Sequence, residues 1–287
     1  MVGCSEEANA TIDRIFITDS SVNAYQRVGG IIGEVKGTKG ATGSDIPTVK
    51  ITRCGIYTAY SNDATKYSIR SALETKDANG NVTRTSGKYV GGIVAHLQYP
   101  ANLTIDSCYV KEPIYNYNQY CGGILGRVDP QSTEAKITVS NCIYGGSIVG
   151  STYAGGIVGG RSSGLITIVN NAMIGNAGGD KSGMIVSNNL CQKKSIGGVN
   201  VYSINEYTTF ENNYYGLADY DPDNTDYTSS EEYIAAVTKN NEWYGNYVLN
   251  SALITKEWYE QYMATFLESF EFSYINYQVQ FKLKKLN

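Results

Sequence analysis

The sequence predicts an all-β protein: a right-handed parallel β-helix (solenoid) with a small α+β region that caps its C-terminal end. The first observation is a Gly-Gly-Ile-aliphatic phrase whose second glycines are Gly30, Gly92, Gly123 and Gly156, in steps of 62, 31 and 33 residues. The second is that short runs of alternating apolar and polar residues surround each phrase. The third is a composition of 31 Gly and 25 Tyr, which favours strands and turns.

A fixed period of this size indicates a stack of like units, and the right hand follows from the preferred crossover of parallel strands. We expect a tether over residues 1–11, a β-helix of about five coils over 12–216 and a cap over 217–287. Three short strands of about four to eight residues, with their turns, fill one period. A cap is expected because the open end of a solenoid needs a cover.

The glycine pairs are expected at a corner where successive coils approach closely. The first step is twice the second, which indicates an insertion, and Asp77-Ala78-Asn79-Gly80-Asn81 predicts a β-hairpin within 60–88. Residues 166–171 are expected to begin a fifth coil, with 196–199 as its glycine phrase and 210–216 as its last strand.

The C-terminal region predicts two helices and a strand. The first helix follows Ser229, which is suited to an N-cap, and has an acidic first turn. The second begins near residue 255 and places Trp258, Tyr262 and Phe266 on one face. Alternating apolar residues over 274–283 predict a half-buried strand.

The cysteines are expected to be free and buried. Cys54, Cys108 and Cys142 occupy one repeat position, which Phe16 takes in the first repeat, and Cys121 stands where other repeats have Val or Ala. A cysteine position that other repeats fill with Val, Ala or Phe is expected to be a core position. Stacked coils direct them in parallel, which is poor geometry for a disulfide. No CxxC or Cys/His cluster suggests zinc.

The overall composition excludes several classes of protein. The net charge is −4 and no basic stripe is present, so nucleic acid is not an expected partner. No apolar run approaches the roughly 18 residues of a membrane helix. No motif suggests a cofactor, and the single His cannot supply a His-Glu-x-x-His zinc site.

The repeats resemble the GLUG-motif family of bacterial surface proteins and secreted proteases. Gly155-Gly156-Ile157-Val158-Gly159 and the strand 137–142 match its pattern, which extends over about 12–216, while Ala95 departs from the final Gly. The resemblance implies an extracellular solenoid and carries no catalytic residues.

The start of the chain is similar to the end of a bacterial lipoprotein signal, in which a small residue precedes a Cys and acidic residues follow it. Cys4, preceded by Gly3 and followed by Ser5-Glu6-Glu7, would then be lipidated and attach the protein to the outer membrane surface. The hydrophobic segment of such a signal is absent, so a Cys4 internal to a longer chain is the alternative.

Tyrosines provide the candidate binding residues. Aromatic side chains can stack on sugars or anchor a protein partner, although tyrosine also suits β-sheet surfaces generally. One group is expected in the third coil and one in the cap: Tyr109, Tyr115, Tyr117 and Tyr120, and Trp243, Tyr244 and Tyr247.

Other polar residues suggest weaker sites. Asp219, Asp221 and Asp223 imitate a calcium loop, but Pro222 and a missing turn glycine break the pattern, so we expect a solvated loop and no metal. His96 is expected to face solvent or pack in a loop, because no partner for general-base catalysis is evident.

The preferred functional hypothesis is a non-catalytic, extracellular or surface-tethered bacterial binding module, an adhesin or a glycan- or protein-binding protein. One alternative is a polysaccharide-degrading enzyme that uses carboxylates such as Asp106, Asp129 and Glu134. The other is a passive structural stalk. The sequence does not identify the ligand.

Overall fold

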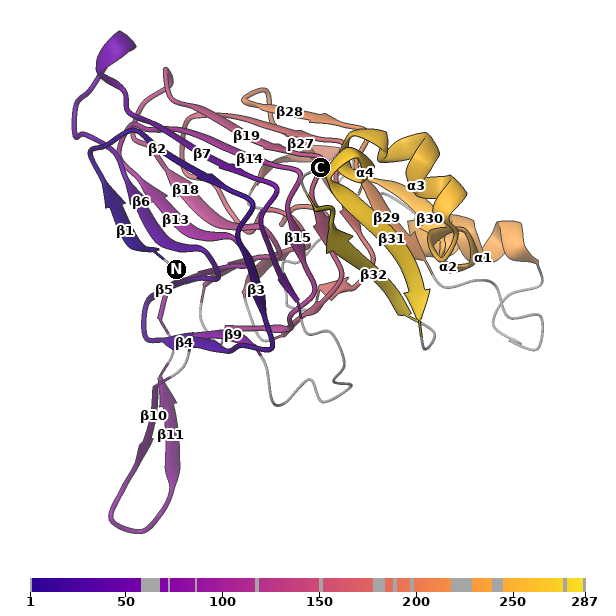
Figure 1. Cartoon of the computed structure of the whole chain (residues 1–287), viewed down its shortest axis with the longest axis horizontal. Coiled ribbons are helices and arrows are strands. Elements are labelled where there is room, and N and C mark those ends of the chain that lie inside the picture. The colour runs from indigo at the N-terminus through magenta and orange to yellow at the C-terminus, as the bar shows by residue number, and fades with distance from the viewer. Residues whose placement is uncertain are drawn as a thin grey trace.

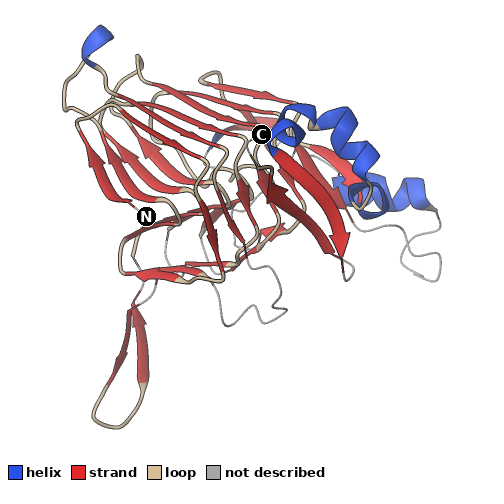
Figure 2. Ribbon diagram, in the orientation of Figure 1, coloured by secondary structure: helices blue, strands red, loops and turns tan. Residues whose placement is uncertain are grey.

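The computed structural model describes residues 2–57, 68–71, 73–85, 87–116, 119–149, 152–177, 184–187, 190–196, 199–217, 229–238, 245–275 and 278–285. Most of the chain forms a parallel β-helix whose strands stack from coil to coil (Figure 1). Figure 2 shows that the α-helices gather in the C-terminal region. The predicted fold class is confirmed.

Each full coil contains up to five short strands, so the strands form five parallel sheets. Sheet 1 consists of β2 (Ala10–Asp13), β7 (Thr48–Thr52), β14 (Asn102–Asp106), β19 (Lys136–Ser140), β23 (Leu165–Val169) and β28 (Thr208–Glu211). Sheet 2 consists of β3 (Phe16–Thr18), β8 (Gly55–Tyr57), β15 (Tyr109–Val110), β20 (Ile143–Tyr144), β24 (Ala172–Met173), β29 (Tyr214–Leu217) and β30 (Asn246–Leu249).

The remaining three sheets complete the circumference of the coils. Sheet 3 consists of β4 (Val22–Ala24), β9 (Ile69–Ser71), β16 (Ile114–Asn116), β21 (Ser147–Val149) and β25 (Asn176–Ala177). Sheet 4 consists of β5 (Arg27–Gly29), β12 (Tyr89–Gly91), β17 (Tyr120–Gly122) and β22 (Tyr153–Gly155). Sheet 5 consists of β1 (Val2–Glu6), β6 (Ile32–Lys36), β13 (Val94–Gln98) and β18 (Leu125–Asp129).

The prediction of three strands per coil is therefore wrong, because two of the three expected strands are each divided into two. The first expected strand becomes β2 and β3, with Arg14 at a φ of 58° between them, and the glycine pair divides another. In the first coil β5 ends at Gly29 and β6 begins at Ile32. A Cβ on Gly92 would lie 1.9 Å from the carbonyl oxygen of Gly123, its equivalent one coil later. The pair is thus a corner where two backbones touch, as predicted.

The β-helix begins earlier than predicted. Residues 2–6 form β1, which pairs in parallel with β6 and places Cys4 opposite Glu34. This strand lies within the expected tether 1–11, so most of that segment is part of the solenoid. The residues around Cys4 are small or polar and do not by themselves predict a strand. The strand forms because it pairs with β6 of the next coil.

The fifth glycine phrase is not at 196–199. Ile196 and Val199 are opposite each other in an antiparallel hairpin of β26 (Cys191–Ile196) and β27 (Val199–Ile204), and Gly197 and Gly198 lie outside the described residues. The coil is continued instead at Ile185, whose carbonyl accepts from the N–H of Ile157 at 2.8 Å. The predicted last strand, 210–216, is divided into β28 of sheet 1 and β29 of sheet 2, and β30 pairs beyond β29.

The predicted insertion is confirmed as an antiparallel hairpin of β10 (Leu73–Lys76) and β11 (Val82–Thr85), which projects away from the coils (Figure 1). The Asp77 carboxylate accepts from the backbone N–H groups of Asn79 and Asn81 at 2.8 and 2.9 Å. A second interruption of the coils contains a short 3₁₀ helix, η1 (Gly43–Asp45).

The interior of the β-helix contains aliphatic side chains and the predicted free thiols. Cys54, Cys108, Cys121 and Cys142 are all buried and unpaired. Burial raises the pKa of the Cys108 and Cys121 thiols well above the usual range, so these thiols stay protonated and unreactive. In later coils Asn171 and Asn213 continue the row, joined by a hydrogen bond of 2.9 Å.

The position of Phe16 differs from the prediction by one residue. Phe16 is in register with Gly55, so Ile15 is the equivalent of Cys54. The Phe16 side chain points outward and its ring packs 5.6 Å from that of Phe270. An apolar aromatic residue in this place predicts a core position. The sequence does not show that the Phe16 ring is instead covered on its outer side by the C-terminal region.

The C-terminal region contains α1 (Ser230–Thr238), α2 (Asn250–Leu253), α3 (Lys256–Tyr262), α4 (Ala264–Ser269), β31 (Phe270–Ile275) and β32 (Gln278–Leu283). Ser229 Oγ accepts from the N–H of Glu232 at 3.1 Å, as expected of an N-cap. The predicted long helix is divided at Met263, and the predicted strand 274–283 is instead part of an antiparallel hairpin, β31–β32.

This region lies along the side of the β-helix rather than across its end. A second hydrophobic core joins Trp258, Phe266 and Phe281 to residues on the outer side of sheet 2, among them Tyr109 and Ile143. The contacts begin at the first coil, where Arg14 Nη1 donates to the carbonyl oxygen of Lys284 at 3.2 Å. Among the described residues of this region, only β30 extends the stack, by pairing with β29. The prediction of an end cap is therefore wrong for the residues after 249.

Candidate binding face

The outer sides of sheets 4 and 5 meet at the glycine corner and form a polar surface that extends over several coils. Val28 and Val35 of the first coil point into the core, so their neighbours Arg27 and Glu34 point outward. Side chains from the two sheets then touch, because Arg27 Nη1 donates to Glu34 Oε2 at 3.0 Å.

This surface, the polar face, consists of three rows of residues in register. The row on sheet 4 contains Arg27, Tyr89, Tyr120 and Tyr153. The first row on sheet 5 contains Cys4, Glu34, His96 and Arg127. The second row on sheet 5 contains Glu6, Lys36, Gln98 and Asp129. No aliphatic side chain occurs in these rows.

His96 lies at the centre of the polar face and joins three coils. Its Nδ1 lies 3.1 Å from Glu34 Oε1 of the preceding coil, and its Nε2 lies 3.1 Å from Asp129 Oδ2 of the following coil. Only 3 % of the side chain is exposed, because the Tyr89 ring stacks on the imidazole at 4.3 Å. A neutral imidazole carries one N–H group, whereas the protonated form carries an N–H group at each nitrogen. Only the protonated form can therefore donate to Glu34 and to Asp129 at the same time.

Both carboxylates are held in the ionised form. Burial acts to raise the pKa of Asp129, but hydrogen bonds from His96, Arg127 and Ser162 outweigh it and hold the pKa well below its usual range. Burial likewise opposes ionisation of Glu34, and its contacts with His96 and Arg27 lower its pKa. Neither group is therefore suited to donate a proton near neutral pH.

Three tyrosines form a ladder on sheet 4. The Tyr120 and Tyr153 rings are stacked 4.7 Å apart with an interplanar angle of 9°, and the Tyr89 ring lies 6.0 Å from that of Tyr120. The Arg127 guanidinium lies 3.9 Å over the Tyr120 ring, and its Nε donates to Asp129 at 2.8 and 2.9 Å. The Tyr120 ring is thus covered by Arg127 and Tyr153, and the Tyr89 ring is stacked on His96.

The predicted tyrosine group of the third coil does not form one surface. Tyr120 belongs to the polar face, but Tyr109 is fully buried in the second core, so its prediction as a binding residue is wrong. Tyr115 lies on sheet 3, where the Arg70 guanidinium is 4.9 Å from its ring centre. Tyr117 lies outside the described residues. These side chains separate because the five strands of a coil face different directions.

The predicted sites of the C-terminal region are only partly described. Tyr247 lies on β30 and is 43 % exposed. Trp243 and Tyr244 lie outside the described residues, as do the weak metal candidates Asp219, Asp221 and Asp223. Among the described residues, no group of three or more His, Cys, Asp or Glu side chains is arranged to hold a metal ion.

The expectation for His96 is wrong, since it is buried between charged partners rather than facing solvent. The carboxylates of the enzyme hypothesis are dispersed: Asp129 is on sheet 5, whereas Asp106 is on sheet 1 and accepts from Ser140 and Asn141. Glu134 accepts from the N–H of Gly43.

The sequence does contain a signal for the row of the polar face that includes His96. Glu34, His96 and Arg127 are separated by 62 and 31 residues, which are the first two steps of the glycine phrase. Alignment of whole repeats on that period would have placed the three residues in one row. The additional tyrosines, Tyr89 and Tyr153, follow from Tyr120 by the same alignment.

Comparisons of the chain with family models, with curated proteins and with solved structures returned no match. The resemblance to the GLUG-motif family therefore stays a prediction. In the described part of the chain, no helix combines the length and hydropathy required to span a membrane.

Proposed function

We propose that the protein is a non-catalytic binding module of the bacterial cell surface, and that it binds a glycan along the polar face. The observation that carries this proposal is the composition of the three rows, which contain hydroxyl, amide, guanidinium and carboxylate groups but no aliphatic side chain. Surfaces that bind other proteins usually have an apolar centre. A polar surface that continues over several coils suits an extended, hydroxylated chain.

The occupied ring faces determine how such a glycan would be held. Tyr89 stacks on His96, and Tyr120 lies between Arg127 and Tyr153, so flat stacking on sugar rings is not the main contribution. The half-buried tyrosines instead offer their hydroxyl edges as hydrogen-bond donors and acceptors. Because the rings are fixed in a ladder, binding requires little loss of side-chain entropy.

Catalysis fits this site less well. Glycoside hydrolysis requires one carboxyl group that is protonated near neutral pH and a second that is ionised. The pKa values of Glu34 and Asp129 are both lowered, and both carboxylates accept hydrogen bonds from charged groups. These observations support a binding function over the polysaccharide-degrading alternative.

The test is a triple variant that removes the hydroxyl groups and keeps the rings: Tyr89→Phe, Tyr120→Phe and Tyr153→Phe. A glycan array first identifies the bound glycan, and the variant is expected to bind it at least about tenfold more weakly, since each lost hydrogen bond contributes about 0.5–1.5 kcal/mol. The matched control is Tyr274→Phe, an exposed tyrosine on β31 in the C-terminal region.

Three results would contradict the proposal. If the array and a cell-adhesion assay both show no binding, the passive stalk becomes the better hypothesis. If a glycan binds with equal affinity to the wild type and the triple variant, the site lies elsewhere. Release of reducing sugar from the bound glycan would favour the enzyme.

We propose that the protein is attached to the cell surface through lipidation of Cys4. The residue is exposed on β1, and in a chain that begins at Cys4 the pairs of Cys4, Ser5 and Glu6 with β6 would remain. Mass spectrometry of the protein from its native host is expected to find a lipid-modified N-terminal Cys4. An unmodified Cys4 that is preceded by other residues would end this part of the proposal.

A further inference from the structure

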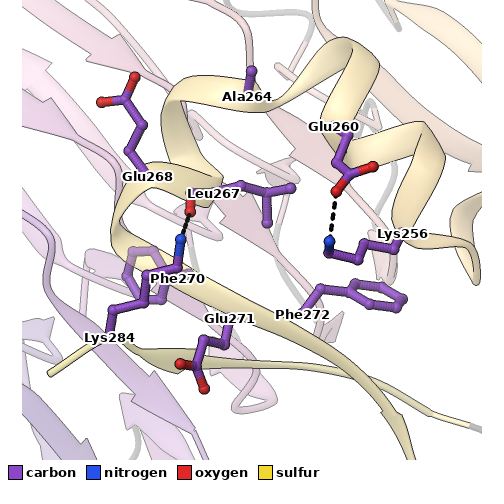
Figure 3. A pocket seen from close by; sticks show the side chains of 9 residues that line it. All are labelled: Lys256, Glu260, Ala264, Leu267, Glu268, Phe270, Glu271, Phe272 and Lys284. Carbon is purple, nitrogen blue, oxygen red and sulfur yellow. Dashed lines mark hydrogen bonds and ion pairs between the residues drawn. The ribbon is translucent and has the colours of Figure 1, made fainter.

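A pocket of about 590 Å³ in the C-terminal region is lined by α3, α4, β31 and Lys284 (Figure 3). The Nζ atom of Lys284 donates to the carbonyl oxygen of Leu267 at 2.6 Å. In Figure 3 the carboxylates of Glu268 and Glu271 point away from the space. Groups of both charges line this pocket, so it does not favour one class of ligand.

A second pocket, of about 390 Å³, lies between the C-terminal region and the outer side of sheet 2. Its volume is within the range of small-molecule sites, which is roughly 300–1,000 Å³. One side is formed by residues that directly follow β15, β20 and β24, and the other by residues of the C-terminal region: Lys111, Gly145 and Ile174, and Asn250, Leu253, Ile254 and Val279.

A missing side chain opens this second pocket. Lys111, Gly145 and Ile174 occupy the same position in three successive coils, directly after paired residues of sheet 2. A Cβ on Gly145 would lie 3.4 Å from Cδ1 of Ile174 and 3.8 Å from Cγ of Lys111. The side chains of Lys111 and Ile174 therefore flank the space that Gly145 leaves empty.

Lys111 gives the pocket a positive charge. It is the only ionisable residue among the described residues that line the pocket, and none of them is acidic. Burial lowers the pKa of Lys111, and the nearby Glu112 carboxylate opposes this shift only in part. The ammonium group thus loses more stabilisation by leaving water than its surroundings return, and an anion in the pocket would restore it.

The other walls of the pocket are mainly apolar. Leu253 is buried in the second hydrophobic core, and Ile174 and Val279 pack against that core. These walls are formed before any ligand arrives, which reduces the entropic cost of binding. Two coil spacings, about 10 Å, separate the backbones of Lys111 and Ile174, which suits a short aliphatic chain.

We propose that this pocket binds a small organic carboxylate with an aliphatic body. The ammonium group of Lys111 donates to the carboxylate, and the aliphatic body lies over Gly145 against Ile174 and Leu253. An organic amine would instead bring a second cation beside Lys111. A neutral molecule would leave the ammonium group without a counter-ion.

Three matched probes test the charge preference: hexanoate, hexan-1-ol and hexan-1-amine share a chain of six carbons and differ in charge. NMR titration of the protein at pH 7 is expected to rank hexanoate first, the alcohol second and the amine last. In the variant Lys111→Met, which keeps an unbranched stem, hexanoate should bind at least about fivefold more weakly, and the alcohol should bind within about twofold of the wild type.

The control is Lys136→Met, which removes an exposed lysine of β19 that does not line the pocket and should leave hexanoate affinity unchanged. A second variant, Gly145→Val, fills the space over the glycine and should weaken all three probes. The proposal is overturned if hexanoate binds no more tightly than the alcohol, or if Lys111→Met and Lys136→Met have the same effect. Undiminished binding of hexanoate to a folded Gly145→Val variant would equally overturn it.

The pocket is independent of the polar face. The triple tyrosine variant should therefore keep full affinity for hexanoate, and Lys111→Met should keep full affinity for the glycan. Failure of one proposed site thus leaves the other intact.

Discussion

Substitution of Gly123 by alanine is expected to destabilise the β-helix by at least about 4 kcal/mol, a loss that only a few mechanisms produce. A Cβ at this position would lie 1.9 Å from the carbonyl oxygen of Gly156 and 2.4 Å from Cγ of Tyr144. Backbone lies on one side and a fully buried aromatic ring on the other, so neither neighbour can move without repacking the coils.

Urea unfolding followed by far-UV circular dichroism measures this effect. The matched control is Gly145→Ala, since a Cβ there would lie 3.4 Å from its nearest atom, Cδ1 of Ile174. The control should lose less than about 1 kcal/mol, within the range of ordinary substitutions. If Gly123→Ala accumulates only as unfolded protein while Gly145→Ala folds, the prediction also holds. Equal stability of the two variants would show that the corner can open.

Substitution of His96 by leucine is expected to cost about 3–5 kcal/mol, the usual effect of removing one partner from a buried ion pair. The variant leaves Glu34 and Asp129 without their hydrogen bonds from the imidazole, and their side chains are only 12 % and 17 % exposed. The matched control is Lys36→Ala on the same sheet, which breaks a more exposed pair with Glu6 and should cost less than about 1 kcal/mol. A similar loss in both variants would contradict the role of His96.

The same cluster predicts the response to acid. The pKa values of Glu34 and Asp129 are lowered by folding, so their contribution to stability is complete above the unfolded values of roughly 4 and is lost as the pH falls toward the folded values. Between about pH 5 and pH 2, the free energy of unfolding should fall more steeply for the wild type than for His96→Leu. Parallel pH profiles would show that the two carboxylates are not stabilised by His96.

The architecture could be predicted because a solenoid repeats its physical requirements in each coil. Gly92, Gly123 and Gly156 meet the same steric demand, and Cys54, Cys108 and Cys142 fill the same interior row, so the pattern is visible at a constant spacing. The exception at the fifth coil has a clear cause. The chain supplies Ile185 without a Gly-Gly phrase before it, whereas the expected phrase at 196–199 begins and ends on Ile196 and Val199, which are paired in an antiparallel hairpin.

The candidate site was harder to predict, because its residues matter only in combination. His96 is a single imidazole in the sequence, and neither Glu34 nor Asp129 is near it along the chain. Tyr109 and Tyr120 are separated by eleven positions and looked like one cluster, yet one is buried under the C-terminal region and the other lies on the polar face.

The amino-acid sequence by itself determined the β-helix, the hairpin insertion and the buried thiols, because each depends on local pattern and on a period that every coil repeats. The tertiary structure alone decided which outward residues meet across the glycine corner. It also decided that the C-terminal region packs along sheet 2, where Tyr109 and Phe16 complete its core. Such contacts join residues far apart in the chain, so no repeat or local preference indicates them.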